Sequence, residues 1–338
     1  MSLVISGIGT GGHYYPALVV AREFMRRKIS VVFLARRGMR EEILARGSGL
    51  PVFCIDPKGF YGKSIRGKLV SIISIILSIA AVSCITRKVV GLSFGGYGSL
   101  PLILSCMINR CPFYLFEPNR ISGRATALFA GKARGLLLGL PPAKGVPCNG
   151  IVTGVPIRHE FKNVRAPAVE IKKLKKILIL GGSQGARRLN DLAIALQHVL
   201  SNDFEITIIS GPSDYLRVQQ QRIRSTRVIS FTDEPWAEIA TADVIISRSG
   251  ALAGYEIMCS GKPVIFIPFP YAIDDHQYHN AVFFAQQGNA LVLRESEADV
   301  NTVARSVQTM MDKKAGGNGL ISDAEQKIVE TIIKENDL

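Results

Sequence analysis

Short, continuous apolar segments alternate with helix-like segments along most of the 338-residue chain. Strands without a polar residue at every second position are typical of parallel sheets that helices cover on both faces. The sequence therefore predicts a doubly wound α/β fold. The predicted strands are residues 3–6, 30–35, 52–55, 89–94, 113–116, 135–139, 177–180, 205–210, 227–230, 244–247 and 264–268.

The pattern starts twice, and both starts have the same form. LVIS at 3–6 leads into the turn GIGTGGH, and ILIL at 177–180 leads into GGSQGARRLN. A charged, proline-bearing segment with poor periodicity lies between the two halves, and the chain is long for a single core. We therefore expect two Rossmann-like domains, residues 1–155 and 156–338, with a linker at about 156–175.

The balance of charges favours anionic partners. The chain has 41 Lys and Arg against 27 Asp and Glu, which gives a net charge of +14. Nucleotides and anionic membrane surfaces fit this excess. No basic segment is interleaved with aromatic residues, so we predict no nucleic-acid partner. The six cysteines form no C-x-x-C pair, which indicates buried thiols in a reducing cytosol, and we expect no secretory signal.

Residues 69–86 carry no charge and have basic residues on both flanks. Their length is about the minimum for a membrane-spanning helix. Ser71, Ser74 and Ser78, however, recur at helical spacing and form a polar stripe along one side. We therefore expect a crossover helix that packs on a sheet and leaves an apolar face exposed. With its basic flanks, the 57–88 region is predicted to dock peripherally on an anionic leaflet.

The turn GIGTGGH fits the dinucleotide-binding pattern G-x-G-x-x-G, but its usual acidic partner is missing. An Asp or Glu about 20 residues on would hold the ribose of NAD. The second predicted strand instead ends near Arg36 and Arg37, which suit the 2′-phosphate of NADP. His13 is placed at a helix N-terminus, where the dipole favours the neutral imidazole. It is either a general base or a helix-start residue that caps or packs.

Other polar residues follow the carboxyl ends of predicted strands, where open α/β sheets bind ligands. Glu256 comes one turn after SRSG, and Tyr97 and Glu117 come after two strands of the first half. These positions predict one cleft between the two halves. Asp274, Asp275, His276 and His279 match no metal-ligand spacing and the chain has no D-x-D motif, so we predict no metal cofactor.

Taken together, the motifs resemble one family of enzymes. GTGGHYYPAL, SFGGYGSLP, FEPNRISGRA, GVPIR, GGSQGARRLN, SRSGALAGYE and PFPYAIDDHQYHNA occur in the order found in the MurG family of bacterial glycosyltransferases. The similarity extends from about residue 3 to 300. It implies a GT-B fold and inverting, metal-independent transfer of GlcNAc from UDP-GlcNAc to the C4 hydroxyl of undecaprenyl-diphosphate-MurNAc-pentapeptide. This is the step from lipid I to lipid II in peptidoglycan synthesis, and it takes place on the cytoplasmic face of the bacterial inner membrane.

The resemblance also implies roles for individual residues. In the second domain these are Ser183, Gln184, Gly185, Ser249, Gly250, Ala251, Leu252 and Ala253 at the diphosphate of UDP-GlcNAc, Glu256 at the ribose, Thr232 and Arg158 near the uracil, and Gln277 and Asn280 at the GlcNAc hydroxyls. In the first domain they are Thr10, Gly11, Gly12, Tyr97 and Asn119 at the lipid acceptor, His13 as the base, and Glu117 as the alternative base.

The sequence departs from the family pattern at a few positions, and two other functions stay open. Ile8 stands where the family usually has glycine, His276 where it commonly has glutamine, and Gly254-Tyr255 where a pair of the Val-Ser or Thr-Glu type is more usual. The alternatives are an NADP-linked oxidoreductase that uses GIGTGGH and a non-catalytic protein that binds a UDP-sugar.

Overall fold

The computed structural model describes residues 2–59, 64–143, 150–164, 174–182, 185–223, 225–313, 320–321 and 323–338. The chain divides into two compact units. The first comprises residues 1–157 and 321–338, and the second comprises residues 158–320. Among the predicted site residues, Ser183 and Gln184 lie outside the described residues, as do residues 165–173 of the predicted linker.

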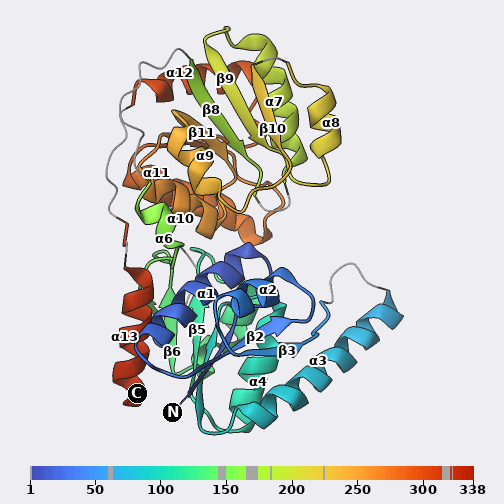
Figure 1. Cartoon of the computed structure of the whole chain (residues 1–338), viewed down its shortest axis with the longest axis vertical. Coiled ribbons are helices and arrows are strands. Elements are labelled where there is room, and N and C mark those ends of the chain that lie inside the picture. The colour runs from blue at the N-terminus through green and yellow to red at the C-terminus, as the bar shows by residue number, and fades with distance from the viewer. Residues whose placement is uncertain are drawn as a thin grey trace. The chain divides into compact units, whose positions relative to one another are not determined.

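The first unit is built on a parallel sheet with the strand order β3-β2-β1-β4-β5-β6-β7 (Figure 1). The prediction of continuous buried strands is confirmed, since all residues of β4 and β5 are buried. The strands are β1 (Ser2–Ser6), β2 (Val31–Arg36), β3 (Val52–Ile55), β4 (Val89–Ser93), β5 (Phe113–Glu117), β6 (Gly135–Leu138) and β7 (Gly150–Val152).

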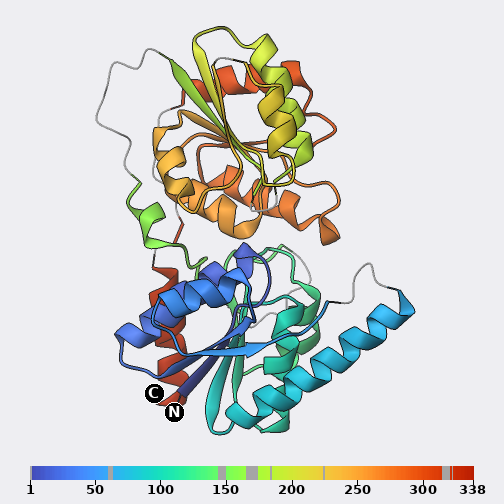
Figure 2. The ribbon, with the colours of Figure 1, turned by 45° about the vertical axis from the view of Figure 1, so that its right-hand side comes forward.

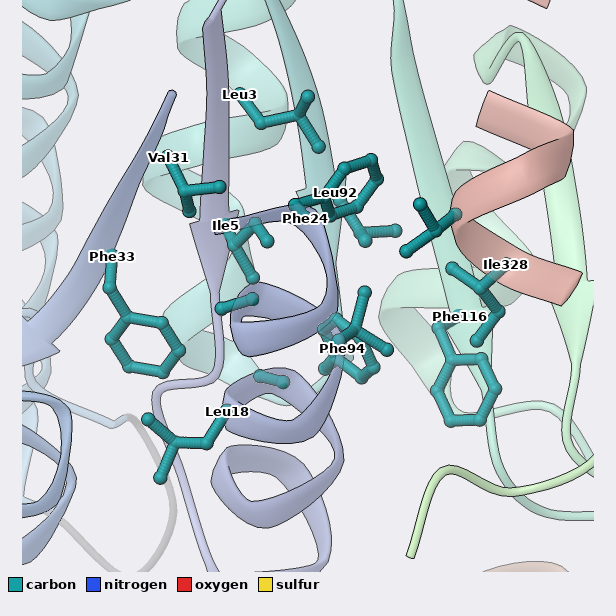
Figure 3. Close-up of a cluster of buried hydrophobic side chains, with 14 of the residues drawn as sticks. Leu3, Ile5, Leu18, Phe24, Val31, Phe33, Leu92, Phe94, Phe116 and Ile328 are labelled. Carbon is teal, nitrogen blue, oxygen red and sulfur yellow. The ribbon is translucent and has the colours of Figure 1, made fainter. Parts of the chain in front are cut away.

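Helices cover both faces of this sheet. Neighbouring residues of a strand point to opposite faces, so Leu3 and Ile5 of β1 belong to the core under α1, whereas Val4 belongs to the core under α3 and α4. Figure 3 shows the first of these cores. The helices are α1 (Gly11–Arg26), α2 (Arg40–Gly47), α3 (Ile65–Ile85), α4 (Leu100–Ile108), α5 (Arg124–Phe129) and α13 (Ala324–Asn336), with short 3-10 turns η1 (Tyr97–Ser99) and η2 (Ala130–Lys132).

The C-terminal helix α13 belongs to the first unit, which corrects the predicted domain division. The sequence placed residues 156–338 together, but α13 packs beside α1, and Ile328 and Ile332 complete the core of the first sheet (Figure 3). The hydroxyl of Tyr114 in β5 donates to Glu335 Oε2 over 2.6 Å. The second domain therefore ends near residue 320.

Helix α3 lies along the outside of the first unit and packs on α4 (Figures 1 and 2). Ser71 and Ser78 are buried, and Ser71 Oγ donates to the carbonyl of Gly59 at 2.9 Å. Several apolar residues of α3 are exposed, among them Ile73 at 50% and Leu77 at 65%. The predicted arrangement of a buried serine side and an exposed apolar face is confirmed. By length and composition alone, α3 would suffice to cross a membrane.

The second unit contains a parallel sheet with the strand order β10-β9-β8-β11-β12-β13. Its strands are β8 (Lys175–Leu180), β9 (Phe204–Ile209), β10 (Thr226–Ile229), β11 (Val244–Ser247), β12 (Val264–Phe266) and β13 (Ala290–Val292). Its helices are α6 (His159–Lys162), α7 (Arg187–Val199), α8 (Tyr215–Gln220), α9 (Pro235–Thr241), α10 (Ala251–Cys259), α11 (His276–Gln287) and α12 (Val300–Met311), with the 3-10 turn η3 (Ile273–Asp275). Two Rossmann-like domains are thus confirmed, and α6 replaces the first part of the predicted linker.

Candidate functional site

The turn between β1 and α1 is shaped around the imidazole of His13. Gly9 has a φ of 154°, and a Cβ at this position would lie 2.6 Å from His13 Nδ1. The N–H of Thr10 donates to the same nitrogen at 3.2 Å, and Thr10 Oγ1 also lies 3.2 Å from it. The glycine therefore makes room for a ring that caps the start of the helix.

His13 is neutral at physiological pH, as the sequence predicted. Burial lowers the pKa of its imidazole from 6.5 to about 4. The cause is desolvation of the charged ring rather than the helix dipole on which the prediction rested. A neutral ring has one nitrogen with a lone pair, and the partner of Nδ1 decides which one it is. In the tautomer with the proton on Nε2, Nδ1 accepts from the N–H of Thr10; in the other, Nδ1–H donates to Thr10 Oγ1 and Nε2 is left unprotonated.

The turn after β4 lies against the same imidazole ring. Gly95 and Gly96 have φ values of 84° and 75°, and a Cβ on either residue would lie 3.5 Å from the ring of His13. Tyr97 follows directly, and its hydroxyl accepts a hydrogen bond from Arg36 Nη1 at 2.9 Å. The structure therefore brings Tyr97 and His13 to the same edge of the first sheet.

Glu117 is committed to the loop that follows β5. Asn119 donates to Oε1 through both its backbone N–H and Nδ2, each at 3.1 Å, and the N–H of Gly123 donates to Oε2 at 2.8 Å. The side chain is 3% exposed. Because these three donors use both oxygens, Glu117 shapes the loop that carries Asn119. Its assignment as the alternative base stays a prediction.

The sequence motifs that suggested a nicotinamide cofactor have other roles in the structure. Arg36 Nε pairs with Glu41 Oε1 at 2.9 Å, and its Nη1 is bonded to Tyr97. An arginine held in this way is not arranged for a 2′-phosphate at the end of β2. The NADP-linked alternative therefore has no support from Arg36.

In the second unit, the turn between β8 and α7 depends on its glycines. Gly182 and Gly185 have φ values of 81° and 78°. A Cβ on Gly181 would lie 2.4 Å from the N atom of Ala186, and one on Gly185 would lie 2.3 Å from the carbonyl of Ser210. Backbone atoms therefore pack tightly at the start of α7, a helix of 13 residues whose first N–H groups have no intrahelical acceptor.

A second turn of this kind leads from β11 into α10, and residues of α11 support it. Ser249 Oγ donates to the carbonyl of Gln277 at 2.8 Å, and Asn280 Nδ2 donates to the carbonyl of Ser249 at 3.2 Å. Gln277 Oε1 accepts from the N–H of Phe269 at 3.0 Å. Asn280 is fully buried and holds the turn in place, and its contact with the GlcNAc hydroxyls stays a prediction. The contact of Gln277 with the GlcNAc hydroxyls likewise stays a prediction.

Arg158 connects two predicted parts of the nucleotide site within the second unit. Its Nε and Nη2 lie 3.1 and 3.4 Å from the oxygens of Glu256, and its Nη1 donates to the carbonyl of Asp233, next to Thr232, at 3.2 Å. The guanidinium also lies over the ring of Trp236, 5.1 Å from its centroid. Arg158 thus brings Glu256 close to the segment that contains Thr232, although these residues are far apart in the sequence.

Burial and the arginine act against each other on the carboxyl group of Glu256. Burial raises the pKa of Glu256 from 4.5 to about 7, and Arg158 limits this increase. Strongly shifted pKa values are concentrated at functional sites but also occur in structural ion pairs, so this shift makes Glu256 a candidate site residue. Among the residues that the structure describes, no group of three or more His, Cys, Asp and Glu side chains is arranged to hold a metal ion.

Comparison with known proteins decides the family. Residues 3–137 and 176–335 match the N-terminal and C-terminal domains of glycosyltransferase family 28. A relative from Aquifex aeolicus is 31% identical over 91% of this chain and 92% of its own length, and one from Coxiella burnetii (strain RSA 493 / Nine Mile phase I) is 34% identical over 87% and 84%. Both are UDP-N-acetylglucosamine--N-acetylmuramyl-(pentapeptide) pyrophosphoryl-undecaprenol N-acetylglucosamine transferases. The chain belongs to the MurG family of glycosyltransferases.

Solved structures agree with the GT-B fold that this family implies. The crystal structure of Acinetobacter baumannii MurG aligns with a TM-score of 0.73 and 24% identity, covering 99% of this chain and all of that one. The glycosyltransferase of kitacinnamycin aligns with a TM-score of 0.71 and 12% identity over 99% of this chain. The second likeness shows that the fold is shared among sugar-transferring enzymes with little sequence in common.

The departures from the MurG pattern have local explanations. Ile8 is fully buried, and a Cβ on Gly98 would lie 2.2 Å from Ile8 Cγ2. The isoleucine therefore fills the space beside the Tyr97 turn. Nδ1 of His276 donates to the carbonyl of Ile273 at 2.9 Å. A Cβ on Gly254 would lie 2.3 Å from the ring of Phe284, so this glycine allows α10 to approach α11.

Arg248, to which no sequence motif gives a role, joins three strand ends of the second sheet. Its Nη1 donates to the carbonyls of Ile267 and Pro268 at 3.0 Å, and its Nη2 pairs with Glu295 at 2.6 Å. Burial lowers the pKa of this guanidinium. An arginine directly after a buried strand was the available signal, but its partners lie 19 to 47 residues further along the chain.

Proposed function

We propose that this protein transfers GlcNAc from UDP-GlcNAc to the C4 hydroxyl of undecaprenyl-diphosphate-MurNAc-pentapeptide, with inversion at the anomeric carbon. The observation that carries the proposal is the identity of 31–34% over most of the chain to transferases with this name. The site residues agree with it, because both units present glycine turns and polar side chains at the carboxyl ends of their strands.

The second unit is proposed to bind the donor. The first N–H groups of α10, at Ala251 to Ala253, and those of α7 are suited to a diphosphate. Glu256 is positioned to accept hydrogen bonds from the ribose hydroxyls, and Arg158 holds its carboxylate in place. As the sugar leaves UDP, negative charge grows on the diphosphate, and fixed N–H dipoles stabilise that charge without having to reorient.

The first unit is proposed to bind the acceptor and to remove the proton from its hydroxyl. Thr10, Gly11 and Gly12, at the start of α1, are suited to the lipid diphosphate, and Tyr97 lies beside them. In the tautomer in which Nδ1–H donates to Thr10 Oγ1, Nε2 of His13 accepts the proton. The C4 oxygen then forms its bond to the anomeric carbon while the bond to UDP breaks.

The surface of α3 supports a peripheral position on the cytoplasmic face of the membrane, where the lipid acceptor would be found. Its exposed apolar residues have basic neighbours at both ends, Arg66 and Lys68 at one and Arg87 and Lys88 at the other, and all four are exposed. An apolar face with basic flanks binds anionic lipid by burial and by charge together. The same surface brings the first unit to its substrate.

Two variants test the division of roles between the units. Replacing His13 by Ala should lower kcat by a factor of about 10²–10⁴, the usual contribution of a general base, and leave the KM for UDP-GlcNAc nearly unchanged. Replacing Glu256 by Ala should instead raise the KM for UDP-GlcNAc. If His13→Ala retains the wild-type kcat, the assignment of the base is wrong. If the wild-type protein binds UDP-GlcNAc but transfers no sugar, it is a non-catalytic binding protein.

A further inference from the structure

Arg36 lies at the end of β2 and has no role in the proposed chemistry so far. Its strand is next to β1, whose end carries the turn with His13, and β1 is next to β4, whose end carries Tyr97. The side chain of Arg36 therefore reaches over the β1 turn to a residue of the proposed acceptor site. From the sequence alone, this arginine is a candidate for binding a different anion, the 2′-phosphate of NADP.

Two contacts fix the guanidinium of Arg36. Nε pairs with Glu41 Oε1 at 2.9 Å, and Nη1 donates to Tyr97 Oη at 2.9 Å. Glu41 lies in the first turn of α2 and is 2% exposed, so its carboxylate is a rigid partner inside the protein. A buried carboxylate needs a compensating charge, and Arg36 supplies it.

The direction of the second hydrogen bond determines what Tyr97 is able to do. A guanidinium has only donors, so the hydroxyl oxygen of Tyr97 must accept from it. The hydroxyl proton of Tyr97 then stays available for donation to another group. A phenol whose oxygen accepts from a cation is a stronger donor toward an anion, because the positive charge polarises its O–H bond.

The ring of Tyr97 is also restrained from a second side. Gly59, in the segment after β3, lies beside it, and a Cβ on this glycine would be 3.6 Å from the ring. The carbonyl of Gly59 accepts from Ser71 of α3. Packing by Gly59 and the hydrogen bond from Arg36 together hold the hydroxyl at one place at the edge of the sheet.

We propose that Arg36, fixed by Glu41, is a positioning residue that orients the hydroxyl of Tyr97 to donate to an oxygen of the acceptor diphosphate. This inference rests on the proposed function, since it assumes that the first unit binds a lipid-linked diphosphate. Arg36 acts through Tyr97 and makes no contact of its own with the acceptor. Lysine cannot replace it fully, because one ammonium group does not reproduce the planar two-point contact.

A double-mutant cycle on the full-length protein tests the inference. Arg36→Ala, Tyr97→Phe and the double variant are compared by the KM for a lipid I analogue and the KM for UDP-GlcNAc. Each single change is expected to raise the acceptor KM about tenfold, the loss of one charge-assisted hydrogen bond, and to leave the donor KM unchanged. The double variant is expected to be no worse than Tyr97→Phe, because Arg36 has no effect once the hydroxyl is gone.

The controls separate positioning from charge and from folding. Arg37→Ala removes the same charge from the neighbouring exposed residue and should leave both KM values close to wild type. Arg36→Lys should have an acceptor KM between those of the wild type and Arg36→Ala. Arg36→Ala leaves the buried Glu41 carboxylate without its partner, so if this variant fails to fold, Arg36→Ala/Glu41→Gln takes its place in the cycle, alone and combined with Tyr97→Phe.

Two results would overturn the inference. The first is a double variant whose acceptor KM rises by the product of the two single effects, which would mean that Arg36 acts independently of Tyr97. The second is an equal rise in both KM values, which would indicate a general structural effect. A wild-type protein that transfers GlcNAc but shows either result refutes this inference alone, whereas a wild-type protein without transfer refutes the proposed function.

Discussion

Removing the positive charge of Arg158 should shift the pH range in which the protein binds its donor. Methionine at this position keeps most of the length of the side chain and its contact with Trp236 but removes the guanidinium that pairs with Glu256. The carboxyl group of Glu256 then remains buried without its charge partner. Its charged form is disfavoured, so its pKa must rise further.

The distances in the structure set the size of this shift. The charges of the pair are about 4 Å apart, and at an effective dielectric constant of about 20 they attract each other by about 4 kcal/mol. One pKa unit corresponds to about 1.4 kcal/mol, so losing Arg158 raises the pKa of Glu256 by up to about 3 units. Because the starting pKa is about 7, Glu256 in the variant is protonated at neutral pH.

Calorimetric titration with UDP-GlcNAc from about pH 5.5 to about pH 8.5 measures the effect across the range in which Glu256 titrates. Wild-type affinity should increase as the pH rises through about 7, because the carboxylate formed there accepts more strongly from the ribose hydroxyls. Arg158→Met should bind about tenfold more weakly at pH 7 and show its increase only at higher pH.

Two further variants make this result decisive. Glu256→Gln should abolish the pH dependence, because it removes the titrating group, and Arg305→Met should behave as wild type, because it removes an exposed charge from α12 of the same unit. The reasoning is refuted if Arg158→Met keeps the wild-type pH profile, or if the profile persists in Glu256→Gln.

Three other variants test packing, burial and the membrane surface. Gly254→Ala places a methyl group against the ring of Phe284 and should lower the free energy of unfolding in urea by about 1–3 kcal/mol. Gly47→Ala, whose added methyl group meets no atom within 4 Å, should leave it unchanged. Equal stabilities of the two variants would contradict the close approach of α10 and α11. The free energy of unfolding should increase between pH 4 and pH 6.5, because the lowered pKa of His13 means that the unfolded state binds more protons in this range. His13→Gln should reduce this increase by no more than about 3 kcal/mol. An unchanged increase would show that the pKa of His13 is not lowered. Replacing Ile73 and Leu77 by Asn should weaken sedimentation of the protein with phosphatidylglycerol vesicles, with little change in thermal stability because both side chains are exposed. Unchanged sedimentation would show that this face of α3 does not bind the membrane.

The strands were predictable because burial on both faces leaves a continuous apolar segment in the sequence. The same rule explains the two that were missed. β7 and β13 have three residues each and are only partly buried, with Ile151 of β7 45% exposed, whereas the equally short β12 is buried throughout and was predicted. The placement of α13 was not predictable either. An amphipathic helix shows that it packs on a core, but its sequence does not say which of two similar sheets provides that core.

The candidate site was predictable where a motif determines the backbone, and less so where side chains meet across the fold. The turns near His13 and Tyr97 require glycine, because the backbone there has a positive φ or the neighbouring atoms leave no room for a Cβ. The polar amide of Asn280 made it a candidate for sugar binding, but the sequence did not show that this amide also holds the Ser249 turn from a fully buried position. The bond from Arg36 to Tyr97 joins residues 61 positions apart, and nothing in the local sequence encodes it.

The most direct test of the central claim is the product formed from UDP-GlcNAc and a lipid I analogue by the purified protein in the presence of EDTA. The account predicts one GlcNAc added to the C4 oxygen of MurNAc in the β configuration, with one UDP released for each product, detected by mass spectrometry and NMR. An α-linked product, transfer that strictly requires an added metal ion, or no transfer while UDP-GlcNAc still binds would contradict it.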